Sequence, residues 1–147
     1  MDSDVPQRTA VGGLMRKTYR GSCHCGAVRF EADLDLDQPT FRCNCSICRR
    51  TRFWPAVARP EEFRMLAGEG ELTKYAFGSG KNHHFFCRRC GVRAFGVGND
   101  TPIGRMYGVN LGCLEGVGEE ELSRLRITYV DGLHDRWDRP PEFGSHL

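Results

Sequence analysis

The chain lacks the features that mark several large functional classes. No apolar run in its 147 residues approaches the ~20 residues that a membrane-spanning helix requires. Residues 1–11 are polar and contain no apolar segment of the kind found in secretion signals. Neither GxGxxG, a Walker motif, GxSxG nor HExxH occurs, so nucleotide-binding, serine-hydrolase and zinc-protease functions have no support.

An excess of charge of one sign is also absent. The chain carries 21 basic and 19 acidic residues, and its formal net charge of +2 is too small to indicate a nucleic-acid partner. Without a secretion signal or an apolar span, we expect a cytoplasmic protein with no membrane partner. Thiols stay reduced in that compartment, where clustered cysteines bind metals more often than they form disulfides.

Glycine is abundant, with 18 residues that lie mostly between short apolar stretches alternating with polar residues. Such alternation is typical of half-buried strands. We therefore predict a single mainly β domain of short antiparallel strands over residues 14–147, after a flexible arm over residues 1–13. Short helices are expected at 46–52 and 119–125, and a tail anchored by Trp137 and Phe143. The alternating apolar residues include Val28, Phe30, Ala32, Leu34 and Leu36, then Tyr107, Val109 and Leu111.

Seven of the eight cysteines form three clusters, CxC, CxCxxC and CxxCG. The two outer clusters together supply four thiols, and the middle cluster supplies three. A structural zinc ion takes four ligands in a closed tetrahedron, whereas a catalytic zinc ion takes three protein ligands and leaves one position open. The spacing thus predicts two zinc ions per chain. The structural ion is expected at Cys23, Cys25, Cys87 and Cys90, and the catalytic ion at Cys43, Cys45 and Cys48.

The second site has a competing interpretation. Any of four other side chains would close it as a fourth ligand, and the ion would then be structural. These four are Cys113, His24, His83 and His84. If the site is open, the residues just after the middle cluster are candidates for binding a substrate, because arginines suit carboxylates and aromatic rings form an apolar wall. The candidates are Arg49, Arg50, Arg52, Phe53 and Trp54; these arginines, with Arg88 and Arg89, would also offset the negative charge of the thiolates.

In this order and spacing the motifs resemble the glutathione-dependent formaldehyde-activating enzyme family, which also includes centromere protein V. The resemblance covers almost the whole chain from about residue 17. The matching segments are GSCHCGAVRF at 21–30, CNCSICRR at 43–50, FFCRRCGVRAF at 85–95, VNLGCL at 109–114 and YVDGLHDRW at 129–137. The stretch 49–55 contains no glycine, which is more similar to the centromere protein V branch.

The resemblance implies a β-tent fold with zinc knuckles, the same two zinc sites, and a carbon–sulfur lyase activity that joins glutathione to formaldehyde. The partners would be a small thiol, with glutathione as the implied example, and a small aldehyde. In this hypothesis the thiol binds the second zinc as a thiolate and attacks the carbonyl carbon, and the reverse reaction cleaves the adduct. The alternative hypothesis is a non-enzymatic zinc module that binds protein or nucleic acid.

Overall fold

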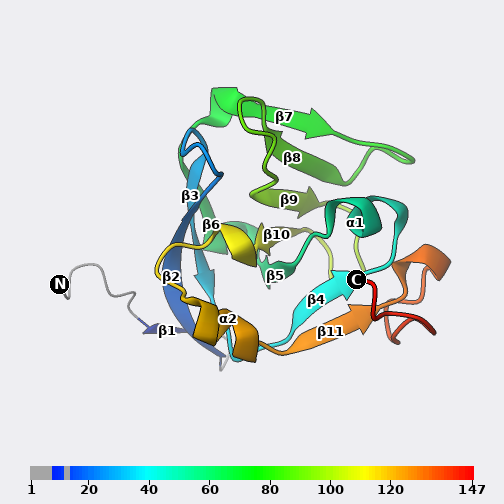
Figure 1. The fold of residues 1–147 in the computed structure, drawn as a ribbon. Helices are drawn as coiled ribbons and strands as arrows, with labels where there is room; N and C mark the ends of the chain where they lie inside the picture. The colour runs from blue at the N-terminus through cyan, green and yellow to red at the C-terminus, as the bar shows by residue number, and fades with distance from the viewer. Residues whose placement is uncertain (1–7, 12–13) are drawn as a thin grey trace.

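Three β-sheets form the framework of the computed structural model, which describes residues 8–11 and 14–147 (Figure 1). The prediction of a mainly β protein with few short helices is confirmed. The two larger sheets share one core. The Phe63 ring stacks 5.3 Å from Phe30 within the first sheet and 4.4 Å from Tyr107 of the second.

The first sheet has four antiparallel strands in the order β1-β2-β3-β6. Its alternating sequence separates two faces, as expected, because successive side chains of a strand point to opposite sides. Phe30 and Ala32 are fully buried, and Leu34 is nearly so. The strands are β1 (Arg8–Val11), β2 (Leu14–Ser22), β3 (Arg29–Leu34) and β6 (Phe63–Ala67).

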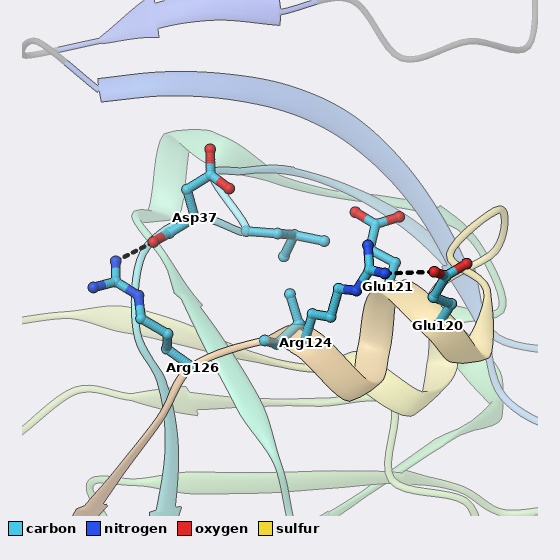
Figure 2. Close-up of a pocket in the computed structure, with 7 residues that line it drawn as sticks. Asp37, Glu120, Glu121, Arg124 and Arg126 are labelled. Atoms are coloured by element: carbon cyan, nitrogen blue, oxygen red, sulfur yellow. Dashed lines mark hydrogen bonds and ion pairs between the residues drawn. The ribbon is translucent and has the colours of Figure 1, made fainter.

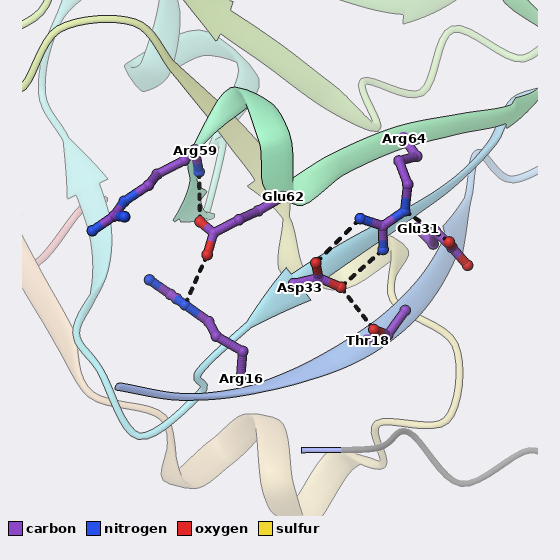
Figure 3. Close-up of polar contacts among 7 residues, drawn as sticks. All are labelled: Arg16, Thr18, Glu31, Asp33, Arg59, Glu62 and Arg64. Atoms are coloured by element: carbon purple, nitrogen blue, oxygen red, sulfur yellow. Dashed lines mark hydrogen bonds and ion pairs between the residues drawn. The ribbon is translucent and has the colours of Figure 1, made fainter. Parts of the chain in front are cut away.

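Polar side chains link the strands of the first sheet to one another and to the turn at Pro60–Glu62 (Figure 3). Arg64 lies 2.8 Å from a carboxylate oxygen of both Glu31 and Asp33. A separate ion pair joins Arg16 to Glu62 at 3.1 Å, with the two side chains only 9% and 4% exposed. The Glu62 carboxylate also accepts the backbone N–H of Arg59, so it is held from two sides.

The second sheet has five antiparallel strands in the order β5-β10-β9-β8-β7. The first two of its strands along the chain, β5 and β7, stand at opposite edges, with β10, β9 and β8 between them. The strands are β5 (Pro55–Ala58), β7 (Leu72–Tyr75), β8 (His83–Cys87), β9 (Phe95–Gly98) and β10 (Met106–Asn110).

The third sheet corrects the expectation that all strands are antiparallel. Strands β4 (Thr40–Cys43) and β11 (Ile127–Val130) pair in parallel, with Val130 opposite Cys43. Parallel neighbours require a long connection, and here most of the second sheet lies between them in the chain. The Thr40 hydroxyl donates to the Arg126 carbonyl and accepts the Trp54 indole N–H, which fixes the start of the pair.

Both predicted helices are present and short. Helix α1 (Ser46–Thr51) begins at Cys45, whose thiol accepts the Cys48 N–H as an N-cap, and ends at Arg52. Helix α2 is Glu119–Arg124. Within the described part of the chain, no helix has the length and apolar character that a membrane crossing requires. Short 3₁₀ turns are η2 (Pro60–Glu62), η3 (Glu69–Glu71), η4 (Leu111–Cys113) and η5 (Gly132–His134).

The two ends of the chain differ from the expectations. Arg8–Val11 pair with β2 as a strand rather than an arm, while residues 1–7 and 12–13 lie outside the described residues. Phe143 is 72% exposed, so it does not anchor the tail. The tail is instead attached where Arg52 donates a hydrogen bond of 2.7 Å to the His146 carbonyl, and Figure 1 shows the C-terminus close to α1.

Candidate metal centres

Four thiols from the outer clusters meet in what we call the first centre: Cys23, Cys25, Cys87 and Cys90. Their sulfur atoms all lie within 4.8 Å of one another. The Cys25 Sγ lies 3.7 Å from both the Cys23 and Cys87 sulfurs. A tetrahedron with Zn–S bonds of about 2.3 Å has an edge of about 3.8 Å, so this donor set fits a zinc ion.

Backbone geometry supports the first centre. The Val28 N–H donates to Cys23 Sγ and the Arg89 N–H to Cys87 Sγ, at 3.3 and 3.4 Å. Gly91 has a φ of 78°, the left-handed conformation that the knuckle turn requires. Cys23 follows β2 and Cys87 ends β8, so this centre ties the first sheet to the second.

The second centre consists of Cys43 at the end of β4, Cys45 at the N-cap of α1, and Cys48 in the first turn of that helix. Their sulfur atoms also lie within 4.8 Å of one another. The Cys45 N–H donates to Cys43 Sγ at 3.4 Å, and the Cys48 N–H donates to Cys45 Sγ at 3.5 Å. Three soft donors gathered by one turn suit zinc as well.

The three thiols of the second centre do not behave as independent groups. Hydrogen bonds from Cys43 and Cys48 lower the pKa of the Cys45 thiol, whereas the thiols of Cys43 and Cys45 raise the pKa of Cys48. The ionisation of each thiol therefore depends on the other two. Binding of a zinc ion requires the loss of all three protons, which makes its affinity dependent on pH.

A guanidinium that the sequence analysis missed lies beside the second centre. The thiols of Cys48 and Cys45 act electrostatically on Arg93, although burial has the largest effect and lowers its pKa. Its carbon Cζ lies 3.8 Å from the centre of the Phe53 ring, and Nη2 lies 2.8 Å from His84 Nδ1. Burial lowers the His84 pKa to about 4, so a neutral Nδ1 accepts this bond. The signal for Arg93 in the sequence was a single arginine within the apolar stretch 92–95.

The loop after β11 covers another side of the second centre. The Asn44 side chain donates to Asp131 Oδ1 at 2.8 Å and accepts the Leu133 N–H at 2.9 Å. His134 Nδ1 lies 2.9 Å from both oxygens of the Asp131 carboxylate. Asn44 stands between two of the clustered cysteines, so this network links the loop to the metal-binding turn.

The five predicted substrate-binding residues lie in different environments. Arg49 is exposed, Arg50 bonds the Ser46 carbonyl of its own helix, and Arg52 bonds His146. Phe53 is buried beneath Arg93. Trp54 is half-buried, with its indole N–H on Thr40.

The candidates for a fourth ligand are divided between the two centres. Cys113 is influenced by the charges of Cys23 and Cys90, so it lies by the first centre rather than the second. This follows from the bridge between Leu114 and Gly21, which brings η4 next to the end of β2. His84 lies by the second centre, while His83 packs edge-on against Phe85. Among the described residues, none of these side chains joins either sulfur group.

Arg88 and Arg89 do not form a free basic surface. Both pair with the Glu71 carboxylate, at 2.5 and 3.0 Å. Hydrogen bonds from these two guanidinium groups lower the pKa of Glu71 to about 2. The carboxylate therefore offsets positive charge beside the first centre, which weakens the case for a nucleic-acid interface there.

A surface cavity of about 490 Å³ lies away from both sulfur groups, between α2 and the turn after β3 (Figure 2). Both of its arginines have partners within the cavity wall. Arg124 pairs with Glu120 at 2.6 Å, and Arg126 donates to the Asp37 backbone carbonyl. None of the clustered cysteines lines this cavity, so it is separate from the candidate metal centres.

Comparison with known proteins places these motifs in a family. A crystal structure of a Rhodobacter sphaeroides protein superposes with a TM-score of 0.64 at 38% identity, covering 74% of this chain and 99% of that one. A Halomonas elongata protein, provisionally named a glutathione-dependent formaldehyde-activating enzyme, is 61% identical over 31 residues. That match spans 21% of this chain and only 20% of the relative. The model of the glutathione-dependent formaldehyde-activating enzyme family matches residues 18–130, and the chain therefore belongs to that family.

Proposed function

We propose that this protein is a cytoplasmic, zinc-dependent carbon–sulfur lyase that adds a glutathione-type thiol to formaldehyde or a similar small aldehyde, and cleaves the adduct in reverse. The observation that carries the proposal is the three-thiol group of the second centre. Catalytic zinc sites combine three protein ligands with one open position, whereas structural sites are closed by four. The family supports glutathione and formaldehyde as substrates.

The two centres have different tasks in this proposal. The first centre, built from buried Cys23 and Cys87 at the core, holds the two larger sheets together. A zinc ion at the second centre would supply the positive charge that keeps a substrate thiol deprotonated near neutral pH. The chain fixes the three sulfurs through backbone N–H groups, and the Phe53 ring excludes water from one side of Arg93.

The test is the rate at which ¹³C-formaldehyde exchanges with its glutathione adduct, measured by NMR exchange spectroscopy, because the uncatalysed reaction also proceeds. We expect the zinc-loaded protein to accelerate the exchange and Cys48→Ser to abolish the acceleration. Cys113→Ser is the matched control, because Cys113 lies outside both sulfur groups. No acceleration by protein that holds two zinc ions would contradict the proposal.

Zinc absorption spectroscopy separates the enzyme from the alternative of a non-enzymatic module. An open second site gains a sulfur ligand when glutathione is added, from three sulfurs to four. A site whose ligand set stays unchanged at saturating thiol is closed, and the binding-module hypothesis would then replace the lyase.

A further inference from the structure

The Arg93 guanidinium lies in a recess that two glycines create. Gly96 and Gly108 stand opposite each other in neighbouring strands β9 and β10. A Cβ at Gly96 would come within 2.7 Å of Arg93 Nη2, and a Cβ at Gly108 within 3.3 Å of the Phe53 ring. Any larger residue at the first position would push the guanidinium out of its place. The sheet therefore has space at these two positions for a stacked arginine and aromatic ring.

Several contacts fix Arg93 in this recess. Phe53 stacks on its face at 3.8 Å, and Nη2 is occupied by His84 at 2.8 Å. The Asn110 side chain donates to the Arg93 carbonyl at 2.8 Å, which holds the backbone. A side chain as long as arginine loses considerable rotamer freedom when it is held in this way. Arg93 is thus held by three contacts from separate segments of the chain.

Two donor atoms of Arg93 have no acceptor. Nε and Nη1 are buried and have no partner in hydrogen-bond geometry among the described residues, although the Cys48 sulfur lies close enough to act on the guanidinium. Buried N–H groups of a cation are costly to leave without a partner. No carboxylate of the described residues pairs with Arg93 either, unlike Arg88 and Arg89. This pattern fits a buried cation with an N–H donor that a ligand completes.

We propose that Arg93 binds the aldehyde-derived oxygen of the substrate, and this inference rests on the proposed lyase function. As the thiolate sulfur bonds to the carbonyl carbon, the π electrons of the C=O bond move to its oxygen, which becomes negatively charged. One of these two N–H groups donates to that oxygen, since Nε–H and Nη1–H point to different sides of the guanidinium, and Arg93 keeps its own proton. Solvent then supplies the proton that yields the hydroxymethyl thioether. This proton replaces the one that the thiol released when it ionised, so the overall reaction neither consumes nor releases protons.

The first experiment measures binding rather than turnover. Calorimetric titration of zinc-loaded protein compares thioacetate, which carries an oxygen one carbon from its sulfur, with ethanethiol, which has the same heavy-atom skeleton without it. We expect Arg93→Met to weaken thioacetate binding at least tenfold and ethanethiol binding less than twofold. Each variant is compared with the wild-type protein for the same thiol, so the difference in acidity between the two thiols cancels. Arg105→Met is the control, because Arg105 stacks on Tyr107 at 5.8 Å on an exposed surface.

Turnover provides the second readout. Loss of one oxyanion donor typically lowers kcat by about 10²–10³-fold. Arg93→Lys keeps the positive charge but replaces the planar guanidinium with an ammonium group. We expect it to lower kcat at least tenfold while the KM for thiol changes little. Both variants must retain two zinc ions. If Arg93→Met weakens both probes equally, or neither, Arg93 acts only through packing or charge and the inference is wrong. If wild-type protein binds neither thiol, the lyase proposal itself fails.

Discussion

Gly132 lies against Cys43 so closely that a Cβ on the glycine would sit 2.5 Å from the Cys43 sulfur. The same Cβ would also lie 2.7 Å from the Trp137 ring. The loop after β11 is therefore packed directly onto a thiol of the second centre, and its glycine permits the contact.

Gly132→Ala should selectively impair the second centre. The added methyl group must displace Cys43 or Trp137, so we expect at least tenfold weaker zinc binding at the second centre and no change at the first. Chelator titration, monitored by released zinc, measures both affinities. Gly70→Ala is the control, since a Cβ there meets nothing within 4 Å. Equal zinc affinity in both variants would show that the loop moves without cost.

Asn44→Ala tests the polar link between the same loop and the metal-binding turn. Its side chain bonds both Asp131 and the Leu133 N–H, at 2.8 and 2.9 Å. Removing the Asn44 amide leaves the buried Asp131 carboxylate with one hydrogen-bond partner fewer, which lowers the free energy of unfolding by about 1–3 kcal/mol. We expect faster amide hydrogen exchange over residues 131–137 and weaker zinc binding at the second centre. Unchanged exchange would mean that β11 alone holds the loop.

Cys87→Ser should lower stability far more than Cys45→Ser. Cys87 is 1% exposed and belongs to a centre that joins two sheets, whereas Cys45 belongs to a local turn. Loss of a structural metal ranks among the largest single-site effects, so we expect more than about 4 kcal/mol for Cys87→Ser. Cys45→Ser should cost less than half of that. Thermal unfolding of the two zinc-loaded variants measures the difference, and similar losses would make the second centre structural as well.

Cys113→Ala should keep both zinc ions. Burial raises the pKa of the Cys113 thiol to about 11, so it stays protonated at neutral pH and is a poor ligand. Metal analysis of the purified variant should still give two zinc ions per chain. One ion instead of two would identify Cys113 as a ligand.

Glu62→Ala should destabilise the protein by about 3–5 kcal/mol, because it removes the carboxylate of a buried ion pair. Replacing both partners, Arg16→Met with Glu62→Leu, should recover most of that loss, since no charge is then buried. Urea unfolding of the single and double variants gives the comparison. A double variant as unstable as the single one would show that the charges themselves are required.

Predictions from the sequence were correct for features that depend on local spacing. They missed features that depend on contacts between strands distant in the chain. The division of cysteines into four and three, the helix after Cys45 and the alternation around Phe30 all depend on neighbours along the chain. Arg93 escaped prediction because its recess exists only when Gly96 and Gly108 meet across two strands. Cys113 was associated with the wrong centre, because the bridge between Leu114 and Gly21 is not visible in sequence.

The parallel pairing of β4 with β11 sets an order of events during synthesis. All ligands of the first centre have been made by residue 90, whereas the loop that packs on Cys43 follows Val130. Pairing between such distant segments is slow, because the intervening chain must be ordered first. A growing chain therefore contains every ligand of both centres before it contains the loop that packs on Cys43, so metal can reach the second cysteine cluster before that loop covers it.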